Sequence, residues 1–284
     1  MRLWGDIVRR ILFVFLVMLM AVSNPSVAAY HKAQPKVAVL YIATGKYIQF
    51  WDRFYQAAEQ YFLPDSQKTY FLFTDQAPSY LDTNDNIVIV PIQHEPWPFV
   101  TLKRYHFFIS QKEVLKDFDY IYFTNANLIF QSVIGDEILP TQEQGLMVTK
   151  HPGYYQEKEL KYIPYDRNPK SIAKVGSNEG QYYFMGGFNG GTARAFLELA
   201  ETIKNWTDFD LSNNVIPRWH DESMLNRYMI DYMANQKPLI LLPNYAIPEE
   251  KLSAMSPEFQ GNIKGVLLDK RKFGGHNWIR QVSD

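Results

Sequence analysis

The sequence predicts an α/β protein with a mixed, mostly parallel twisted sheet flanked by helices. Short aliphatic runs alternate with segments of helical periodicity, an order typical of parallel strands joined by helices. Hydrophobic residues make up 46% of the 284-residue chain and aromatic residues 15%. Such a composition provides a sizeable core and is too apolar for a disordered chain.

Four segments are predicted to form strands, because each is a short apolar run with few polar interruptions. Val37–Ile42 is the clearest, since it is aliphatic and follows Pro35. The other three are Tyr70–Phe73, Ile87–Val90 and Tyr120–Phe123. Strands buried on both faces carry such continuous apolar runs, which indicates a sheet covered on both sides.

Four longer segments are predicted to be helical from the spacing of their apolar residues. They are Ile48–Phe62, Thr101–Leu115, Thr192–Trp206 and Glu222–Asn235. Thr192 and Asp221 stand in the N-cap positions of the last two helices. The methionines of the fourth helix recur on one face and are expected in the core rather than in a ligand site.

Residues 1–30 are read as a targeting segment rather than part of the fold. Arg2, Arg9 and Arg10 precede an apolar run at residues 11–22, and Pro25 follows it. The run is shorter than the about 20 residues that span a bilayer, which favours a signal peptide and an exported or envelope-associated protein. A retained membrane anchor through residues 7–29 is the alternative, and a folded part that faces the cytoplasm stays open. The folded domain is expected at residues 36–284.

The charge balance excludes a general polyanion binder. The chain carries 29 basic and 30 acidic residues, so we expect no nucleic-acid partner. With no cysteine, disulfides and thiolate chemistry are excluded. Five cations nevertheless lie within the last 21 residues: Lys264, Lys270, Arg271, Lys272 and Arg280. They form either a solvated tail or a cationic flap over an anionic ligand, with Gly274 and Gly275 permitting its motion.

Ligands of an open α/β sheet bind beyond the carboxyl ends of its strands. Two turns stand at such ends, Thr44–Tyr47 after the first strand and Thr124–Asn127 after Tyr120–Phe123. The chain contains neither a dinucleotide-binding G-x-G-x-x-G nor a phosphate loop. Oxidoreductase and nucleotide-hydrolase functions therefore lack their usual motif.

Four longer motifs resemble glycosyltransferase family 6, the retaining α-1,3-galactosyl- and N-acetylgalactosaminyltransferases that include the ABO blood-group enzymes. They are Phe73–Gln76 (FTDQ), His151–Tyr155 (HPGYY), Tyr182–Gly191 (YYFMGGFNGG) and Trp219–Asn226 (WHDESMLN). The resemblance runs from about Val37 to Arg280. It implies a single nucleotide-sugar-binding domain of the GT-A type, a UDP-sugar donor and a galactoside acceptor.

The sequence departs from the animal members of this family at Asn125-Ala126-Asn127. Those members carry Asp-x-Asp there, which holds manganese on the UDP diphosphate, whereas bacterial members resemble this chain. Two asparagines offer only neutral oxygens to a hard cation, so we expect no metal site and no required cofactor. Side chains would then meet the diphosphate charge, and Lys272 and Arg280 are the candidates. The alternatives are that the asparagines only shape a turn, or that manganese binds through water and other ligands.

The resemblance assigns the chemistry to Glu222, as nucleophile or as stabiliser of the positive sugar. Its place in the first turn of a helix is expected to favour the ionised form. Asp221 is expected to contact donor-sugar hydroxyls or to cap the helix. By the same resemblance His151, Trp219 and Glu222 bind the acceptor, although a tryptophan or histidine also serves in packing.

Further donor-binding residues are carried over from the family. Ile42, Thr44 and Tyr47 match a segment that packs on uracil and ribose, and Arg104 matches an arginine near the donor. Met185, Gly186 and Gly187 align with residues that sort donors. The missing side chain at Gly187 is expected to leave room for a 2-acetamido group, which favours N-acetylgalactosamine over galactose. The double glycine is also expected to form a tight turn before the Thr192 helix.

The sequence thus predicts a hexosyltransferase that is retaining and independent of metal. It would move N-acetylgalactosamine, or galactose, from UDP to O3 of a galactoside, with Fucα1-2Gal the acceptor that family analogy favours. A carbohydrate-binding protein on a degenerate transferase scaffold is the alternative from another class. The donor, the acceptor, the oligomeric state and the choice between double displacement and front-face transfer stay open.

Overall fold

The computed structural model describes residues 34–76, 78, 85–254, 257–259 and 261–281. The predicted targeting segment at residues 1–30, including the anchor alternative at residues 7–29, lies outside the described residues. Within the described ranges, no helix combines the length and the hydropathy that a membrane span requires.

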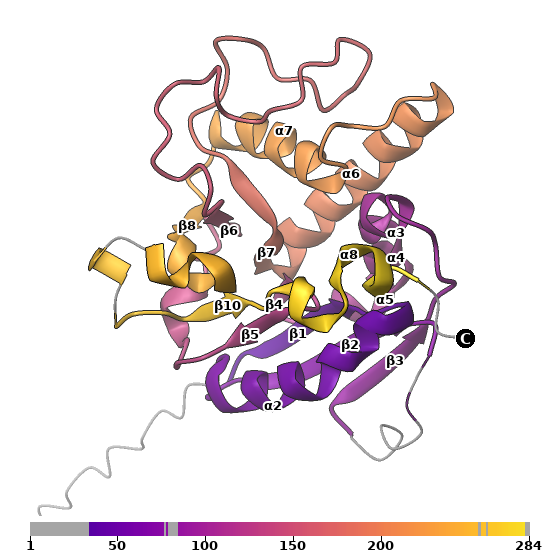
Figure 1. Ribbon diagram of the computed structural model, residues 1–284, viewed down its shortest axis with the longest axis vertical. Helices are drawn as coiled ribbons and strands as arrows, with labels where there is room; N and C mark the ends of the chain where they lie inside the picture. The colour runs from indigo at the N-terminus through magenta and orange to yellow at the C-terminus, as the bar shows by residue number, and fades with distance from the viewer. Residues whose placement is uncertain (1–33, 77, 79–84, 255–256, 260, 282–284) are drawn as a thin grey trace, which may run out of the picture. The chain divides into compact units, whose positions relative to one another are not determined.

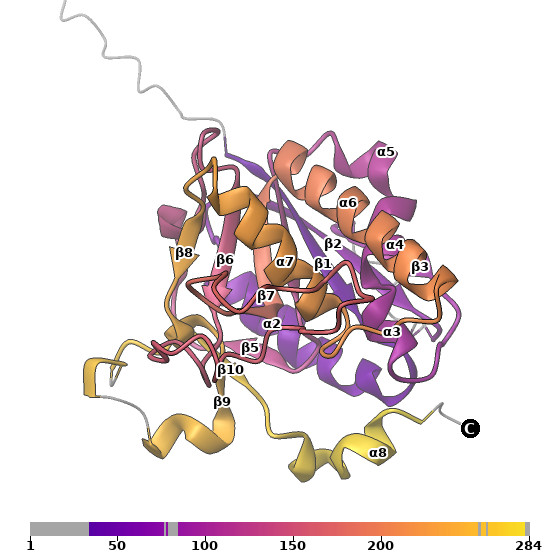
Figure 2. The same ribbon diagram turned by 90° about the horizontal axis from the view of Figure 1, so that it is seen from above.

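The main sheet of the fold has seven strands in the order β3-β2-β1-β4-β7-β6-β8 (Figures 1 and 2). The first four strands of the chain, β1 to β4, pair with one another in parallel. β7 is antiparallel to both of its neighbours, β4 and β6, and β8 is parallel to β6. The strands are β1 (Lys36–Ile42), β2 (Gln67–Thr74), β3 (Ile87–Pro91), β4 (Tyr120–Thr124), β6 (Leu146–Lys150), β7 (Phe184–Thr192) and β8 (Leu239–Leu241). The predicted mixed, mostly parallel α/β sheet and its four predicted strands are confirmed.

Helices cover both faces of this sheet, and the alternation of side chains along β1 shows why. Val39 and Tyr41 pack into one core cluster with α2, while Ala38 and Leu40 pack into another with α4, α6 and α7. The α-helices are α2 (Trp51–Tyr61), α3 (Phe99–Leu102), α4 (Arg104–Ser110), α5 (Lys112–Leu115), α6 (Ala193–Ser212), α7 (Asp221–Met233) and α8 (Gly275–Ile279). The 3-10 helices are η1 (Gly45–Phe50), η3 (Asp136–Ile138), η4 (Pro243–Tyr245), η5 (Glu249–Ala254), η6 (Pro257–Phe259) and η7 (Lys270–Phe273).

A small second sheet brings the C-terminal part of the chain to the end of β4. Its order is β5-β10-β9, formed by β5 (Leu128–Phe130), β10 (Gly265–Leu267) and β9 (Ile247–Pro248). Asn127 fastens this junction, because its backbone oxygen accepts from Leu268 N and its Nδ2 donates to Leu268 O, both at 2.8 Å. The segment that carries η7 and α8, yellow in Figure 2, continues from there.

Three of the predicted helices differ from the observed ones. Ile48–Phe62 begins as the 3-10 helix η1 and becomes α-helical only at Trp51. Thr101–Leu115 is not one helix but the three short helices α3, α4 and α5, because the backbone leaves helical geometry at Lys103 and Gln111. α6 continues beyond the predicted end to Ser212, and Thr192 caps it as predicted by accepting from Ala195 N.

The fourth predicted helix is α7, and two expectations are wrong: the N-cap of α7 and the tight turn before α6. His220, with φ 55°, is the N-cap, and Asp221 is the first helical residue. Gly186 and Gly187 do not form a tight turn, because they lie inside the fully buried strand β7. The methionine stripe is in the core as expected, with Met224 and Met229 fully buried.

Candidate active site

The turns after β1 and β4 meet at one cavity, as the parallel pairing of these strands predicts. The cavity has a volume of about 230 Å³. Its lining consists of Ile42, Thr44, Tyr47, Trp97, Val100, Thr101, Arg104, Phe123, Asn125, Ala126, Asn127, Lys270 and Arg280. The structure thus brings together seven of the predicted donor residues: Ile42, Thr44, Tyr47, Arg104, Asn125, Asn127 and Arg280.

The charge of this lining is entirely positive. Arg104, Lys270 and Arg280 contribute cations, and no aspartate or glutamate is among the residues that line the cavity. The Nζ atom of Lys270 also lies 5.1 Å from the centroid of the Tyr47 ring. Because opposite charges attract strongly where water is partly excluded, such a cavity suits an anionic group.

Of the two cations predicted to meet that group, only one reaches the cavity. Arg280 lines it, whereas Lys272 is 60% exposed and pairs with Glu249 at 2.7 Å. Lys270, two residues earlier, lines the cavity instead. The basic cluster in the sequence correctly indicated cations at this cavity. The backbone of η7 determines that Lys270, rather than Lys272, lines it.

Aromatic and cationic side chains hold the C-terminal segment against the cavity. The guanidinium carbon of Arg280 lies 4.4 Å from the centroid of the Trp97 ring, and Lys46 Nζ lies 4.0 Å from that of Trp278. Trp97 also makes an edge contact with His220, at 5.0 Å between ring centroids. Sequence reasoning missed Trp97, since a single tryptophan in a loop carries no distinctive pattern. Whether the C-terminal segment moves as a flap stays a prediction.

Arg104 connects this cavity to the start of α7. Its Nη1 lies 2.9 Å from Asp221 Oδ2 and donates to the carbonyl oxygen of Gly186 at 2.8 Å. Both side chains are buried, with 9% and 2% exposed for Arg104 and Asp221. Burial raises the pKa of Asp221, and the Arg104 guanidinium opposes that rise. A buried ion pair of this kind fixes the geometry of both partners.

Glu222 is held by the same residue, Gly186, through its backbone N–H. Its Oε2 accepts from Gly186 N at 2.8 Å. Burial raises the pKa of Glu222, and the Gly186 hydrogen bond opposes the rise. The expectation that the helix terminus favours the ionised form is therefore corrected, since desolvation outweighs the stabilising groups at this position.

These features identify the protein family when they are set beside known sequences. Residues 26–280 match the model of glycosyltransferase family 6. The chain belongs to glycosyltransferase family 6. The resemblance predicted from the motifs is confirmed, and the chain is a hexosyltransferase.

Three relatives illustrate the breadth of the family. The chain is 33% identical over 214 residues to the O-antigen biosynthesis glycosyltransferase WbnI of Escherichia coli, covering 75% of this chain and 88% of that protein. It is 29% identical over 258 residues to the globoside alpha-1,3-N-acetylgalactosaminyltransferase 1 of Mus musculus, covering 88% and 70%. It is 28% identical over 243 residues to the histo-blood group ABO system transferase 1 of Rattus norvegicus, covering 82% and 66%.

The residues present do not fit a hard divalent cation such as manganese. Asn127 donates its Nδ2–H to Leu268 O, so its side chain offers only the neutral Oδ1, and Asn125 likewise offers only a neutral oxygen. The nearby carboxylates are engaged, Asp221 with Arg104 and Glu222 with Gly186. Within the described ranges, no group of three or more His, Cys, Asp or Glu residues could hold a metal ion.

The space beside Gly187 differs from what the sequence suggested. A Cβ built on Gly187 would lie 2.4 Å from Asn125 Nδ2 and 3.0 Å from Met185 Cε. The place of the missing side chain is therefore filled by protein. This geometry shows no open space for a 2-acetamido group beside Gly187. A role of Gly187 in sorting donors is supported only by its alignment with the donor-sorting residues of the family.

The predicted acceptor residues lie on two segments near Glu222. His151 makes ring contacts with Tyr154 and Tyr183, at 5.1 and 5.7 Å between centroids. Burial and Lys251 lower the pKa of His151 to about 4, so its ring is neutral at physiological pH. Because Nδ1 accepts from Gly153 N at 3.0 Å, Nε2 carries the proton and can donate to a hydroxyl.

Trp219 is presented differently, with its side chain 45% exposed. Its backbone is anchored on both sides: Trp219 N donates to Ser223 Oγ at 2.9 Å, and Arg218 N donates to the buried Asp166 at 2.7 Å. An exposed aromatic face on a fixed backbone suits a sugar ring. Sequence reasoning missed Asp166, because a loop aspartate carries no signal until its partner is known.

Proposed function

We propose that this enzyme is a retaining, metal-independent transferase that moves N-acetylgalactosamine or galactose from UDP to O3 of a galactoside such as Fucα1-2Gal. The observation that carries the proposal is the cavity lined by Arg104, Lys270 and Arg280 without a carboxylate. Because Arg104 is already paired with Asp221, Lys270 and Arg280 are the cations left to balance the negative charge of a nucleoside diphosphate without a divalent ion. Arg104 links the same cavity to Asp221 and to Gly186, the residue that holds Glu222.

The proposed donor would lie with uridine against the turn after β1 and its diphosphate against the cations. Ile42, Thr44 and Tyr47 supply that turn, while Asn125 and Asn127 stand across from them at the end of β4. Arg104 adds a buried Nε without a hydrogen-bond partner among the described residues, a donor that a bound oxygen would satisfy. No placement of the sugar is needed for this part of the proposal.

In the reaction, the bond between C1 of the sugar and the UDP oxygen breaks and its electron pair leaves with UDP. In front-face transfer, O3 bonds to C1 on the face that UDP leaves, its proton passes to a diphosphate oxygen, and ionised Glu222 stabilises the positive charge at C1. In double displacement, Glu222 bonds to C1 on the opposite face as UDP leaves, and O3 then displaces the carboxylate and gives its proton to a diphosphate oxygen. His151 would position the acceptor through Nε2–H and Trp219 through its exposed ring.

The experiment is UDP release and product analysis with both UDP-sugars and 2′-fucosyllactose, in the presence of a chelator. We expect transfer to persist with chelator and to fall at least about 100-fold in Glu222→Gln. Lys270→Gln should raise the KM of the UDP-sugar about tenfold through loss of one charged contact, whereas the matched Lys272→Gln should not.

Three results would overturn parts of this proposal. Loss of transfer in chelator with recovery in manganese would contradict metal independence. Undiminished activity of Glu222→Gln would remove the role of that carboxylate. Glycan binding without measurable affinity for UDP would favour the carbohydrate-binding alternative, since such a protein has no use for a donor.

A further inference from the structure

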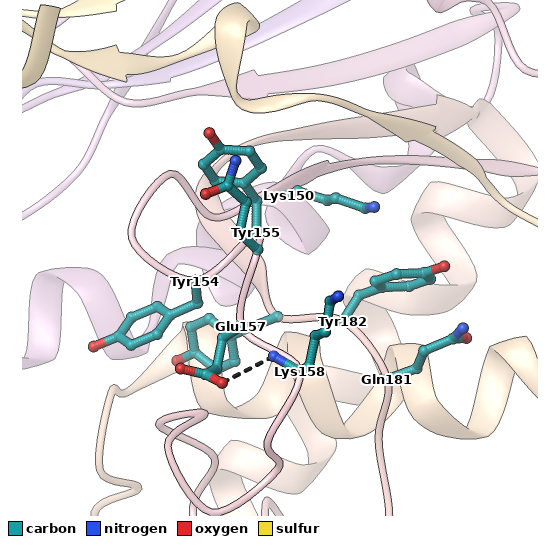
Figure 3. Close-up of a pocket in the computed structure, with 9 residues that line it drawn as sticks. Lys150, Tyr154, Tyr155, Glu157, Lys158, Gln181 and Tyr182 are labelled. Carbon is teal, nitrogen blue, oxygen red and sulfur yellow. Dashed lines mark hydrogen bonds between the residues drawn. The ribbon is translucent and has the colours of Figure 1, made fainter. Parts of the chain in front are cut away.

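A second cavity, of about 370 Å³, lies beside the turn that follows His151. It is lined by the turn after β6 and by the residues that lead into β7 (Figure 3). These are Lys150, Tyr154, Tyr155, Gln156, Glu157, Lys158, Gln181, Tyr182 and Tyr183. The lining combines aromatic rings with amides and charged groups, a composition suited to a polar ligand that has flat faces.

The cavity adjoins the proposed acceptor site through shared side chains. Tyr154 and Tyr183 line it, and the same two rings contact the ring of His151. The backbone of His151 is also bonded to Tyr183, with His151 N donating to its carbonyl oxygen at 2.9 Å. A glycan whose terminal sugar contacts His151 therefore has this cavity within reach of its next unit.

The charge of the cavity is the second observation. Lys150 Nζ lies 4.1 Å from the centroid of the Tyr182 ring, and within the part of the chain that the structure describes neither Lys150 nor Lys158 pairs with a carboxylate. The one carboxylate of the lining is already engaged, because Glu157 Oε1 accepts from the backbone N–H groups of Lys158 and Glu159 at 2.8 and 2.9 Å. The first of these bonds is drawn in Figure 3. Glu157 keeps its negative charge, but the two ammonium groups outweigh it, so the lining is net positive and can meet an anion.

We propose that this cavity binds a second sugar unit of the acceptor, next to the one that reacts, and that this unit carries a carboxylate, as a hexuronic acid does. The inference rests on the proposed function, since it extends the acceptor site of that reaction. Tyr154 and Tyr182 would pack against the ring, Lys150 and Lys158 would meet the carboxylate, and Gln181 would reach a hydroxyl. The residue that sets acceptor preference is then Lys150, because its ammonium is held against Tyr182.

The test compares three acceptors: methyl β-galactoside, lactose and galactosyl-glucuronic acid. The wild type should use the acidic disaccharide at least about tenfold better in kcat/KM than lactose, mainly through KM. Lys150→Met and, independently, Lys158→Met should remove this preference while leaving methyl β-galactoside unchanged. The control is Lys161→Met, because Lys161 lies in the same loop, pairs with Glu159 at 2.7 Å and does not line the cavity.

Direct binding separates a failure of this inference from a failure of the proposed function. Isothermal titration of the wild type and of Lys150→Met with galactosyl-glucuronic acid needs no turnover. Weaker binding by the variant, in a protein that transfers to none of the acceptors, would uphold the cavity and overturn the proposed function. Normal transfer with equal use of lactose and the acidic disaccharide, or equal effects of Lys150→Met and Lys161→Met, would overturn the cavity proposal alone.

Discussion

Gly187→Ala tests whether the donor-sorting position is governed by protein packing or by open space. The added Cβ would lie 2.4 Å from Asn125 Nδ2 and 2.9 Å from Asn125 Cγ. The amide must therefore move by about 1 Å to restore ordinary van der Waals separation. Overpacking of a buried site costs about 1–3 kcal/mol, so we expect the free energy of unfolding to fall by about 2 kcal/mol without any ligand present.

The same geometry predicts that a second substitution restores most of this loss. Asn125→Ala removes both clashing atoms and leaves only Met185 Cε, 3.0 Å from the new Cβ, at the end of a flexible side chain. In a double-mutant cycle measured by urea unfolding, we expect the two substitutions to be non-additive by about 1–2 kcal/mol. Gly135→Ala is the control, because its Cβ would meet only the mobile Glu137 carboxylate, at 3.1 Å.

Two results would refute this reasoning. Gly187→Ala could leave stability within about 0.5 kcal/mol of the wild type, which is the scatter of surface substitutions. Alternatively, the effects of Gly187→Ala and Asn125→Ala could add to within the same margin. In either case the side chain of Asn125 would not fill the space beside Gly187 in solution. The position could then act on the donor directly, as the sequence first suggested.

Three further predictions concern buried charge. Burial raises the pKa of Glu222 above its ordinary 4.5, and the ionised form is required, so transfer should already decline at a pH above 4.5 as the pH falls. A pH–rate profile that stays level down to pH 4.5 would contradict this. The pKa of His151 is about 4 in the folded protein and 6.5 in the unfolded chain, so the unfolded chain binds a proton first as the pH falls. The free energy of unfolding should therefore decrease by about 2 kcal/mol between about pH 7 and about pH 4.5. Urea unfolding of His151→Gln should show a correspondingly smaller acid loss, and an unchanged loss would exclude His151 as its source. Asp221→Ala should lower the free energy of unfolding by about 3–5 kcal/mol, because it leaves Arg104 buried and unpaired. The surface substitution Asp231→Ala should lower it by under about 1 kcal/mol in the same thermal or urea measurement. Equal losses in the two variants would show that the Arg104–Asp221 pair contributes no more than a surface ion pair.

The sequence was informative where the determinants were local. The apolar run of β1 predicted a buried strand, and parallel pairing of β1 with β4 placed Thr44 and Asn125 at one edge. The breaks in Thr101–Leu115 could not be read from periodicity, because Lys103 and Gln111 are ordinary helix formers whose backbone is set by tertiary contacts. Helix existence was predictable here, but helix continuity was not.

The remaining site residues depend on contacts between distant parts of the chain. Lys270 reaches the cavity because β10 pairs with β5, which begins just after Asn127. A pairing of two three-residue strands so far apart in the chain cannot be predicted from the sequence pattern. Arg104 and Asp221 are likewise far apart in sequence, so the raised pKa of Glu222 could not be inferred from a first-turn position alone. Desolvation is a property of the assembled fold, whereas the helix dipole is a property of the segment.

Gly186 explains why the donor and catalytic sides of this site must respond together. Its N–H donates to Glu222 and its carbonyl oxygen accepts from Arg104, so a displacement of this one residue, in the two peptide planes that meet at its Cα, disturbs both side chains. A Cβ at Gly186 would stand 3.2 Å from Asp221 Oδ2 and 3.3 Å from Glu222 Cβ, which shows how closely α7 approaches β7. A glycine there permits the approach that brings the carboxylate to the backbone. Substitution of Arg104 should therefore change the orientation of Glu222 as well as donor affinity, because the two residues are connected through the backbone they share.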